Sequence, residues 1–482
     1  MRKGYALSLL ILLVTFTVFG CMVGPNYQRP AVDTPQSWRF EEKEAKDLAN
    51  TTWWEQFEDS VLSELIQTSL RENKDLLIAT ASIEEFLGYY RTTRGNLFPE
   101  VSAGASAGME QVSRLGIPPL GGGVDFRDDF YEASLNGSWE IDFWGKLRRA
   151  TEAARADLLS TEEARRTVIL TLVTSVASAY VYLRDLDNQL EIAKRTTKTR
   201  EESYRIFALR FKGGVISELD LYQTKSQYEE ALATIPVLEK AIVQQEHALS
   251  ILLGRNPGAI TRGKSIDELK LPAVPQGLPS DLLARRPDIL QAEQDLVAAN
   301  ARIGEARAQY LPTISLTGGL GTSSTQLSDL FTGPAGMWNF ATPIAAPIFT
   351  AGRISGQVKS AKAVQKQALL RYQQSIQNAF RDVDDALVGQ MKTREQLAIQ
   401  GNQVDSLRKY AHFARLRYDE GYTSYMEVLD AERSLFDSEL SYTQTKGDLF
   451  QALVNTYKAM GGGWITEADK MTSVQTKAVG KD

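Results

Sequence analysis

The chain contains few of the residues on which enzymes and metal proteins depend. Among its 482 residues are two histidines and one cysteine. The histidines, His247 and His412, lie far apart in the sequence and lack the spacing of a metal-ligand motif. One cysteine alone forms neither an internal disulfide nor a thiolate metal site. The formal net charge of −6 argues against a general nucleic-acid binder. The sequence therefore predicts no enzyme, no metal, no cofactor and no nucleic-acid partner.

The N-terminus carries a targeting segment that is too short to span a membrane. The apolar run from Ala6 to Phe19 has about 14 residues and follows two basic residues, whereas a spanning helix needs about 20. This pattern is typical of a secretory signal peptide over residues 1–20. Cys21 follows directly, as in a bacterial lipobox, and Met22 replaces the aspartate of the inner-membrane retention signal. We expect a diacylglyceryl group and an N-acyl chain on Cys21; an ordinary buried cysteine is the alternative.

The rest of the sequence repeats itself once. Residues 73–76 align with residues 286–289, and residues 97–99 align with residues 310–312. The first copy has the longer loop between its strands. The turn-forming residues of that loop are Pro118, Pro119, Gly121, Gly122 and Gly123. Each half is predicted to contain a helix that ends before a proline, a pair of strands, and a very long helix that turns back at glycine.

Two segments of each half alternate between apolar and polar residues, which is the pattern of a half-buried strand. We expect strands at about residues 99–112, 129–143, 312–323 and 337–349. The fourth strand is broken by Pro343 and Pro347. Segments of about 10 residues with one apolar and one polar face fit a barrel with lipid outside and water inside. A soluble sandwich is the alternative, although it would need more strands and less helix.

The number of strands predicts that several copies of the chain share one barrel. Four strands cannot close a barrel, and an open sheet edge in lipid leaves unpaired backbone groups. Two copies would supply eight strands, whose side chains nearly fill the interior, whereas three would supply twelve and leave a lumen. The strand count therefore favours a homotrimer.

The long helices are the most unusual prediction. Residues 146–212 contain no proline or interior glycine, and residues 355–420 contain no proline. At about 1.5 Å per residue, each helix would be close to 100 Å long. Apolar residues such as Leu172, Val176 and Ala179 recur at the heptad spacing of packed helices. A globular core does not need helices of this length, whereas a conduit across the periplasm does.

Glycines mark the predicted tips of the conduit. Gly213 and Gly214 follow the first long helix and Gly421 follows the second, as glycine commonly does at helix ends. Acidic residues come next in both halves. They are Glu218 and Asp220 in the first half and Glu427 and Asp430 in the second.

These acidic residues could cap helices or form a gate. Ser424 with Glu427, and Ser217 with Asp220, have the spacing of a capping box. Glu427 could serve either role, whereas Asp430 lies a turn too far into its helix to cap, which favours the gate. The cluster Asp382, Asp384 and Asp385 sits in the middle of a helix and is expected to face solvent in the lumen or on the outer face.

Four motifs resemble those of the TolC-like outer-membrane factors, in the OprM/CusC-type branch. They are residues 21–30, residues 282–289, residues 427–436 and the closing Gly461-Gly462-Gly463-Trp464. Together they cover nearly the whole mature chain. The resemblance implies an α+β membrane protein that forms a homotrimer. Each protomer would contribute four strands to one twelve-stranded β-barrel, and the barrel would continue into a twelve-helix α-barrel tunnel. It also implies a small mixed region of helices and strands around the middle of the tunnel, near Trp53 and Trp54.

The resemblance also implies where the channel closes. Asp430 and Glu427 match acidic rings at the tips, and Met426 matches an apolar constriction. Asp220 and Tyr418 match a pair that locks neighbouring helices, with Thr423 where TolC has an arginine. Gly213, Gly214 and Gly421 would form the tip turns that contact an adaptor.

The implied function is the passive exit duct of a tripartite efflux pump in the outer membrane of a Gram-negative bacterium, lipid-anchored and extending into the periplasm. Its partners would be a periplasmic adaptor protein, an inner-membrane RND transporter driven by proton flow, and outer-membrane lipid. The exit duct of a type I protein secretion system is the alternative, which the lipobox disfavours. A trimeric coiled-coil adhesin is a different class, and the internal repeat argues against it.

The expected organisation of the chain follows the repeat. A lipidated linker at residues 21–58 precedes repeat 1 at residues 59–254, and a second linker at residues 255–280 precedes repeat 2 at residues 281–464. Residues 465–482 are expected to form a C-terminal tail.

Overall fold

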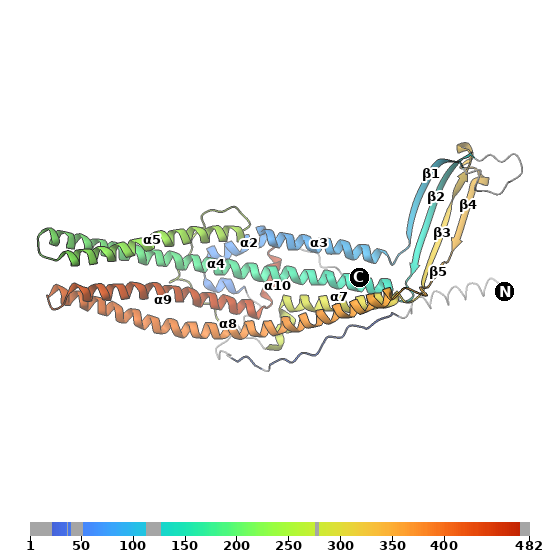
Figure 1. The fold of residues 1–482 in the computed structure, drawn as a ribbon. Helices are drawn as coiled ribbons and strands as arrows, with labels where there is room; N and C mark the ends of the chain where they lie inside the picture. The colour runs from blue at the N-terminus through green and yellow to red at the C-terminus, as the bar shows by residue number, and fades with distance from the viewer. Residues whose placement is uncertain (1–21, 36, 40–51, 112–126, 275–278, 473–482) are drawn as a thin grey trace. The chain divides into compact units, whose positions relative to one another are not determined.

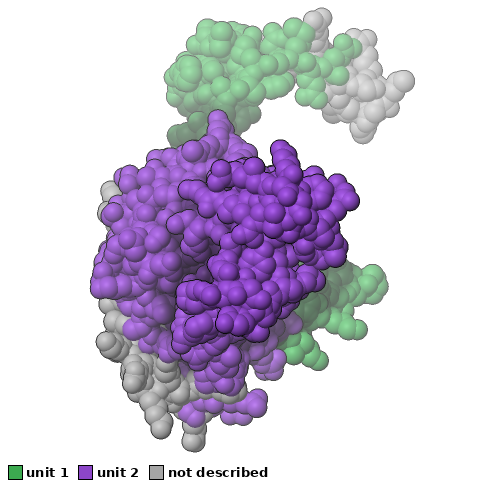
Figure 2. All heavy atoms as spheres, turned by 90° about the vertical axis from the view of Figure 1, so that its left-hand side faces the viewer, with its two compact units in different colours: residues 1–31, 83–160, 292–372 green, residues 32–82, 161–291, 373–482 purple. Residues whose placement is uncertain are grey.

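The computed structural model describes residues 22–35, 37–39, 52–111, 127–274 and 279–472. The predicted signal peptide, Cys21, and the turn-rich loop that contains Pro118 and Gly121 lie outside these residues. The chain divides into two compact units, which are coloured green and purple in Figure 2. The first unit comprises Met1–Ala31, Ile83–Ser160 and Ala292–Tyr372, and the second comprises Val32–Ser82, Thr161–Gln291 and Gln373–Asp482.

The first unit contains one antiparallel sheet, whose strands are labelled in Figure 1. The strands are β1 (Glu100–Gln111), β2 (Arg127–Ile141), β3 (Thr313–Ser324), β4 (Gly336–Ala341) and β5 (Ile344–Ala345). They lie in the order β1-β2-β3-β4, and the short β5 also pairs with β3. The middle of the sheet therefore joins β2 from the first half of the chain to β3 from the second.

The register of the sheet separates an apolar face from a polar one. Ala103 pairs with Leu135, Leu135 with Leu320, and Leu320 with Trp338, so that these side chains form one row across four strands. The next row, on the opposite face, consists of Ser102, Asn136, Gly319 and Asn339. Two-residue periodicity in each strand produces this separation.

The apolar face is uncovered by the described residues. Leu135 is 46% exposed, Leu320 is 62% exposed and Trp338 is 82% exposed. A soluble sandwich would bury such a row beneath a second sheet, and the described part of the chain supplies no such layer over it. The face instead has the character of a surface that contacts lipid.

The fourth strand differs from the prediction of one interrupted strand at residues 337–349. β4 ends at Ala341 and β5 contains only two residues, so residues 346–349 do not extend the sheet. Proline has no N–H to donate to a ladder. The carbonyl of Pro343 nevertheless accepts a hydrogen bond from the backbone of Ser315 at 3.1 Å, which keeps the segment beside β3.

The helices occur in matched pairs, one from each half of the chain. The pairs are α3 (Lys74–Gly95) with α7 (Pro287–Ala308), α4 (Lys146–Lys212) with α8 (Arg353–Asp419), and α5 (Glu218–Leu252) with α9 (Tyr425–Met460). Both α4 and α8 have 67 residues, which corresponds to about 100 Å each. α4 also contains an apolar window of membrane-spanning length, but 56% of that window is buried within the chain.

The second unit is built around a cluster of aromatic side chains. Trp53 and Trp54 in η1 (Trp53–Phe57) and Trp464 in α10 (Trp464–Lys470) are almost completely buried. The ring of Trp53 stacks on that of Tyr457 with 5.0 Å between centroids. α2 (Ser60–Glu72) completes this core with Leu62 and four further buried residues. The segments before the first repeat and after the second therefore pack together in one core.

A buried carboxyl group lies in the packing between α4 and α9. Asp185 on α4 is 2% exposed, and Gln189 donates to its Oδ2 at 2.9 Å, whereas its Oδ1 has no partner. Gly447 on α9 lies against it, since a Cβ there would be 3.1 Å from the Asp185 Cγ. Burial raises the pKa of Asp185 to about 6, to which the nearby Asp448 adds. The uncharged carboxyl is therefore the form that the core favours.

The buried carboxyl predicts a pH-dependent stability. Because the pKa of Asp185 is higher in the folded chain than in the unfolded one, its stabilising contribution is complete at low pH and is lost as pH rises through about 6. Asp185→Asn, which stays uncharged, should raise the thermal unfolding midpoint clearly at pH 8 and little at pH 4. The gain at pH 8 should be up to about 3 kcal/mol. An equal gain at both pH values would contradict this account.

Candidate functional site: a polar wall and the helix tips

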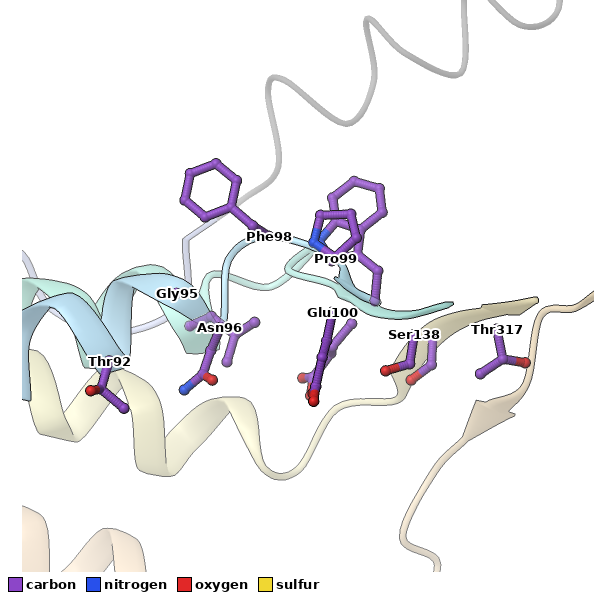
Figure 3. A pocket seen from close by; sticks show the side chains of 12 residues that line it. Thr92, Gly95, Asn96, Phe98, Pro99, Glu100, Ser138 and Thr317 are labelled. Atoms are coloured by element: carbon purple, nitrogen blue, oxygen red, sulfur yellow. The ribbon is translucent and has the colours of Figure 1, made fainter. Parts of the chain in front are cut away.

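A polar wall begins where α3 meets the sheet. Figure 3 shows the side chains of Thr92, Asn96, Glu100, Ser138 and Thr317 on one side of the backbone and Phe98 on the other. The polar side chains line a cavity of about 690 Å³. The cavity thus joins the end of α3 to the strands, and apolar residues such as Phe98 and Leu147 line it as well.

Two tryptophans fix the junctions between helices and strands. The indole N–H of Trp139 donates to the carbonyl of Leu97 at 2.9 Å, and that of Trp144 donates to the carbonyl of Pro312 at 2.8 Å. Leu97 and Pro312 lie in the two aligned segments of the repeat. The alternation of residues predicts Trp139 on a strand, but the spacing of residues does not show which carbonyl an indole reaches.

The residues that follow Cys21 are held against the start of α4. The backbone N–H of Val23 donates to the carbonyl of Trp144 at 3.0 Å. Arg149, which is 1% exposed, donates to the carbonyls of Val23 and Gly24 at 3.2 and 3.4 Å and to the Oδ1 of Asn26 at 2.8 Å. A buried guanidinium therefore fixes the segment next to the predicted lipid attachment site.

The helix tips are formed by glycines in left-handed backbone conformations. Gly214 has a φ of 70° and Gly421 has a φ of 78°, which side chains disfavour. The N–H of Val215 bonds to the carbonyl of Arg210 at 2.9 Å, and the N–H of Tyr422 bonds to that of Arg417 at 2.8 Å. These are the bonds of a Schellman motif, and they end α4 and α8 in the same way.

The two predicted capping boxes have different outcomes. At the start of α5, Asp220 accepts from the Ser217 backbone at 3.2 Å, and the Ser217 hydroxyl accepts from the Asp220 backbone at 3.2 Å. This capping box is therefore confirmed. At the start of α9, capping was one of two alternatives for Glu427, and the Ser424 side chain makes no capping bond. Glu427 instead pairs with Arg417 at 2.8 Å and accepts from the Thr423 hydroxyl.

The predicted gate residues occupy separate places at the tip. Asp430 accepts from Arg433 at 2.9 Å, and both side chains are about half exposed. Both line a cavity of about 410 Å³ together with Met426 and Leu219. The structure thus brings Met426 and Asp430 to one cavity and directs Glu427 toward the end of α8.

The predicted pair of Asp220 and Tyr418 has other partners in this chain. The hydroxyl of Tyr418 accepts from Arg210 of α4 at 2.9 Å, whereas Asp220 bonds to Ser217. Tyr418 also packs on the buried Tyr425 with 4.9 Å between ring centroids. The contact of Arg210 with Tyr418 was not predicted, because the spacing of these residues in the sequence does not show it.

The aspartates in the middle of α8 are less solvated than expected. Asp382 bonds to Arg381 at 2.7 Å and to the buried Arg286 at 3.3 Å. Asp384 accepts from the backbone of Arg39 at 3.3 Å. Two of the three predicted solvent-facing residues are therefore tied to other parts of the second unit, and Asp385 remains largely exposed.

No group of three or more histidine, cysteine or acidic side chains suited to a metal ion occurs in the described part of the chain. An amphipathic sheet with an exposed apolar face, followed by paired helices of about 100 Å, defines a class of membrane channel subunits. The chain belongs to the outer membrane efflux protein family, whose model matches residues 65–255 and 278–462. Members of this family are outer-membrane channels, so the chain is an outer-membrane protein and not an enzyme.

The relatives have matching lengths. The cation efflux system protein CusC of Escherichia coli O6:H1 is 35% identical over 468 residues, which are 95% of this chain and 99% of CusC. The probable outer membrane lipoprotein SilC of Salmonella typhimurium is 37% identical over 476 residues, which are 96% of this chain and all of SilC. These similarities confirm the OprM/CusC-type resemblance that the motifs indicated.

The fold is also that of solved channels. The structure of the open state of the MtrE outer membrane channel of Neisseria gonorrhoeae superimposes with a TM-score of 0.83 at 30% identity. The match covers 92% of this chain and 99% of MtrE. The combination of helices and strands described above is therefore the architecture of a channel protomer.

The capping difference at the tips predicts a difference in local stability. Ser217→Ala removes the cap of α5 and should cost about 1 kcal/mol, so the amides at the start of α5 should exchange with solvent about fivefold faster. Ser424→Ala is the matched control, because Ser424 forms no capping bond, and it should leave exchange at the start of α9 unchanged. Equal effects of the two substitutions would refute this account of the tips.

Proposed function

We propose that the chain is one protomer of a homotrimeric exit duct in a tripartite RND-type efflux pump. Three copies would combine their sheets into a twelve-stranded barrel and their long helices into a twelve-helix tunnel. Small toxic compounds would pass through it across the periplasm and the outer membrane without energy input by the channel. A periplasmic adaptor and an inner-membrane transporter would deliver them.

The observation that carries the proposal is a sheet with an exposed apolar face and two open edges. Among the residues that the structure describes, β1 and β4 each pair with one neighbouring strand, and their outer edges have no partner. In lipid, every backbone N–H and carbonyl needs a partner. A shared barrel satisfies these groups and places the row of Leu320 and Trp338 against lipid and the row of Asn136 and Asn339 toward water.

The tip would act as the gate. Asp430 lines the tip cavity with Met426, and its carboxylate accepts a hydrogen bond from the half-exposed Arg433 of its own helix. Three copies of this carboxylate around one axis would form a narrow, negatively charged constriction, which favours cations. The turns at Gly213, Gly214 and Gly421 would be the surface on which the adaptor docks and opens the gate.

If Asp430 forms the gate, its substitution should change the ion selectivity of the channel. Asp430→Ala should raise the conductance of single channels in planar bilayers and lower the cation-to-anion permeability ratio several-fold, because a ring of carboxylates is removed. Asp267→Ala is a control that removes one charge from an exposed residue outside the tip. Unchanged conductance and selectivity in Asp430→Ala would exclude this residue as the gate.

Cys21 would carry the lipid anchor. The name of SilC as an outer membrane lipoprotein supports this, as does the ordered segment that Arg149 holds directly after Cys21. Acyl chains contribute about 0.8 kcal/mol per buried methylene, so they would anchor the trimer without spanning the membrane.

Lipidation can be tested by metabolic labelling. Labelled palmitate should enter the wild-type chain and should be absent from Cys21→Ala, since the chain has no other cysteine. Mass spectrometry of the mature wild-type chain should find residues 1–20 removed. Continued labelling of Cys21→Ala would show that the lipid lies elsewhere.

A further inference from the structure

A carboxylate of α9 is held by two other helices at the same time. The Oε2 of Glu439 accepts from the Nη2 of Arg195 on α4 at 2.9 Å. Its Oε1 accepts from the Nε and Nη2 of Arg408 on α8 at 3.2 and 2.9 Å. The Glu439 side chain is 11% exposed, whereas the two arginines are more than half exposed. One nearly buried carboxylate therefore joins three long helices.

A cavity lies beside this bridge. It has a volume of about 510 Å³, lies between the three helices, and is lined by Arg195, Arg408 and Glu439 among other residues. Direct contacts close the α4–α9 seam at both ends of this stretch. Phe207 packs on Tyr425 with 4.1 Å between ring centroids, and Asn188 bonds to Thr443 at 3.3 Å. Phe436 of α9, which also lines the cavity, is buried in the core of the second unit. The ion bridge adds a charged link between the three helices beside this cavity, where van der Waals contact is reduced.

The other charged groups at the cavity have different partners. Arg200 of α4 donates to the carbonyl of Gln227 on α5 at 2.8 Å and lies over the ring of Phe436 on α9. Burial raises the pKa of Glu432, while the positive charges of Arg415 and Arg200 oppose this shift. Arg408 also pairs with Asp405 of its own helix at 3.4 Å, whereas Glu439 is the carboxylate that links Arg195 of α4 to Arg408 of α8. Loss of the Glu439 charge would therefore break the link between these helices and leave Arg195 without this carboxylate.

The bridge lies close enough to the tip to control it. Glu439 follows Asp430 by nine residues on one uninterrupted helix, a distance of about 13 Å. A helix segment of this length moves as a rigid element. The position of α9 against α4 and α8 at Glu439 therefore determines where Asp430 lies.

We propose that Glu439 is a positioning residue for the gate, an inference that rests on the proposed channel function. Its bridge to Arg195 and Arg408 holds α9 in the closed arrangement. In this proposal, opening would separate α9 from α4 and would break the bond between Glu439 and Arg195. The bridge would therefore set how readily the closed channel opens, while Asp430 sets which ions pass.

The test is the conductance of the closed channel. Glu439→Gln keeps the size of the side chain and removes its charge, so the full-length trimer in planar bilayers should conduct at least about threefold more without an adaptor. Glu395→Gln is the matched control. Glu395 pairs with Lys392 at 2.7 Å within α8 alone, and its loss should leave conductance unchanged.

A double-mutant cycle separates the bridge from a general loss of stability. Arg195→Gln should also raise conductance, and Arg195→Gln combined with Glu439→Gln should raise it no further than Glu439→Gln alone, because both substitutions remove one interaction. Additive effects would overturn the proposed bridge. So would a Glu439→Gln channel that conducts like the wild type.

These recordings separate a failure of the proposed role of Glu439 from a failure of the proposed channel function. If the wild type conducts and Asp430→Ala changes its selectivity while Glu439→Gln does not alter its conductance, the bridge is refuted and the channel function stands. If the wild-type trimer forms no conducting channel, the proposed function fails and the role of Glu439 fails with it.

Discussion

The unpaired outer edges of the β-sheet, at β1 and β4, are the constraint on which the rest of the molecule depends. β1 pairs with β2 from Glu100 to Gln111, but the sheet order gives it no neighbour on its other side. The same is true of the outer side of β4. Backbone groups left open in lipid are too costly to persist. In the proposed trimer, these edges would meet edges of other copies, and the lumen would follow from that closure.

The long helices, like the sheet edges, leave surface in the isolated chain that lacks a partner. α5 and α8 expose large apolar side chains in the isolated chain, among them Leu219, Val237, Ile399 and Phe413. Exposed apolar surface of this extent marks a protein interface, and neighbouring copies would cover it in the proposed tunnel. The matched helix lengths of the two halves mean that each copy contributes two similar helix pairs, which suits a ring. Within one chain, the contacts between these pairs include Arg195 with Glu439 and Arg210 with Tyr418. A few polar contacts of this kind can be broken without unfolding the helices.

Much of the fold could be predicted from local patterns, because the responsible physics is local. Alternation of residue type indicated β1, β2 and β3, and the absence of proline indicated α4 and α8. Gly214 and Gly421 marked the tips because few other residues adopt their backbone conformation. The early end of β4 was harder to predict, since Pro343 keeps one hydrogen bond to β3 while interrupting the strand.

The candidate site was less predictable, because it depends on which partner each side chain reaches. Ser217 and Ser424 have similar sequence contexts, yet only Ser217 caps its helix, since Arg417 draws Glu427 away from Ser424. Tyr418 bonds to Arg210, which is more than 200 residues away in sequence. The cavity beside Glu439 leaves no trace in the spacing of residues. Family resemblance pointed to Asp430 and Met426, and the structure adds that they share one cavity.

The central claim is that three copies share one barrel and one tunnel. Native mass spectrometry of the complex, extracted from the outer membrane in mild detergent, tests this claim most directly. The account predicts a single assembly of three chains, each with its mature mass and bound lipid. A stable monomer or a dimer as the membrane-embedded species would contradict it, because neither leaves a closed sheet around an open lumen.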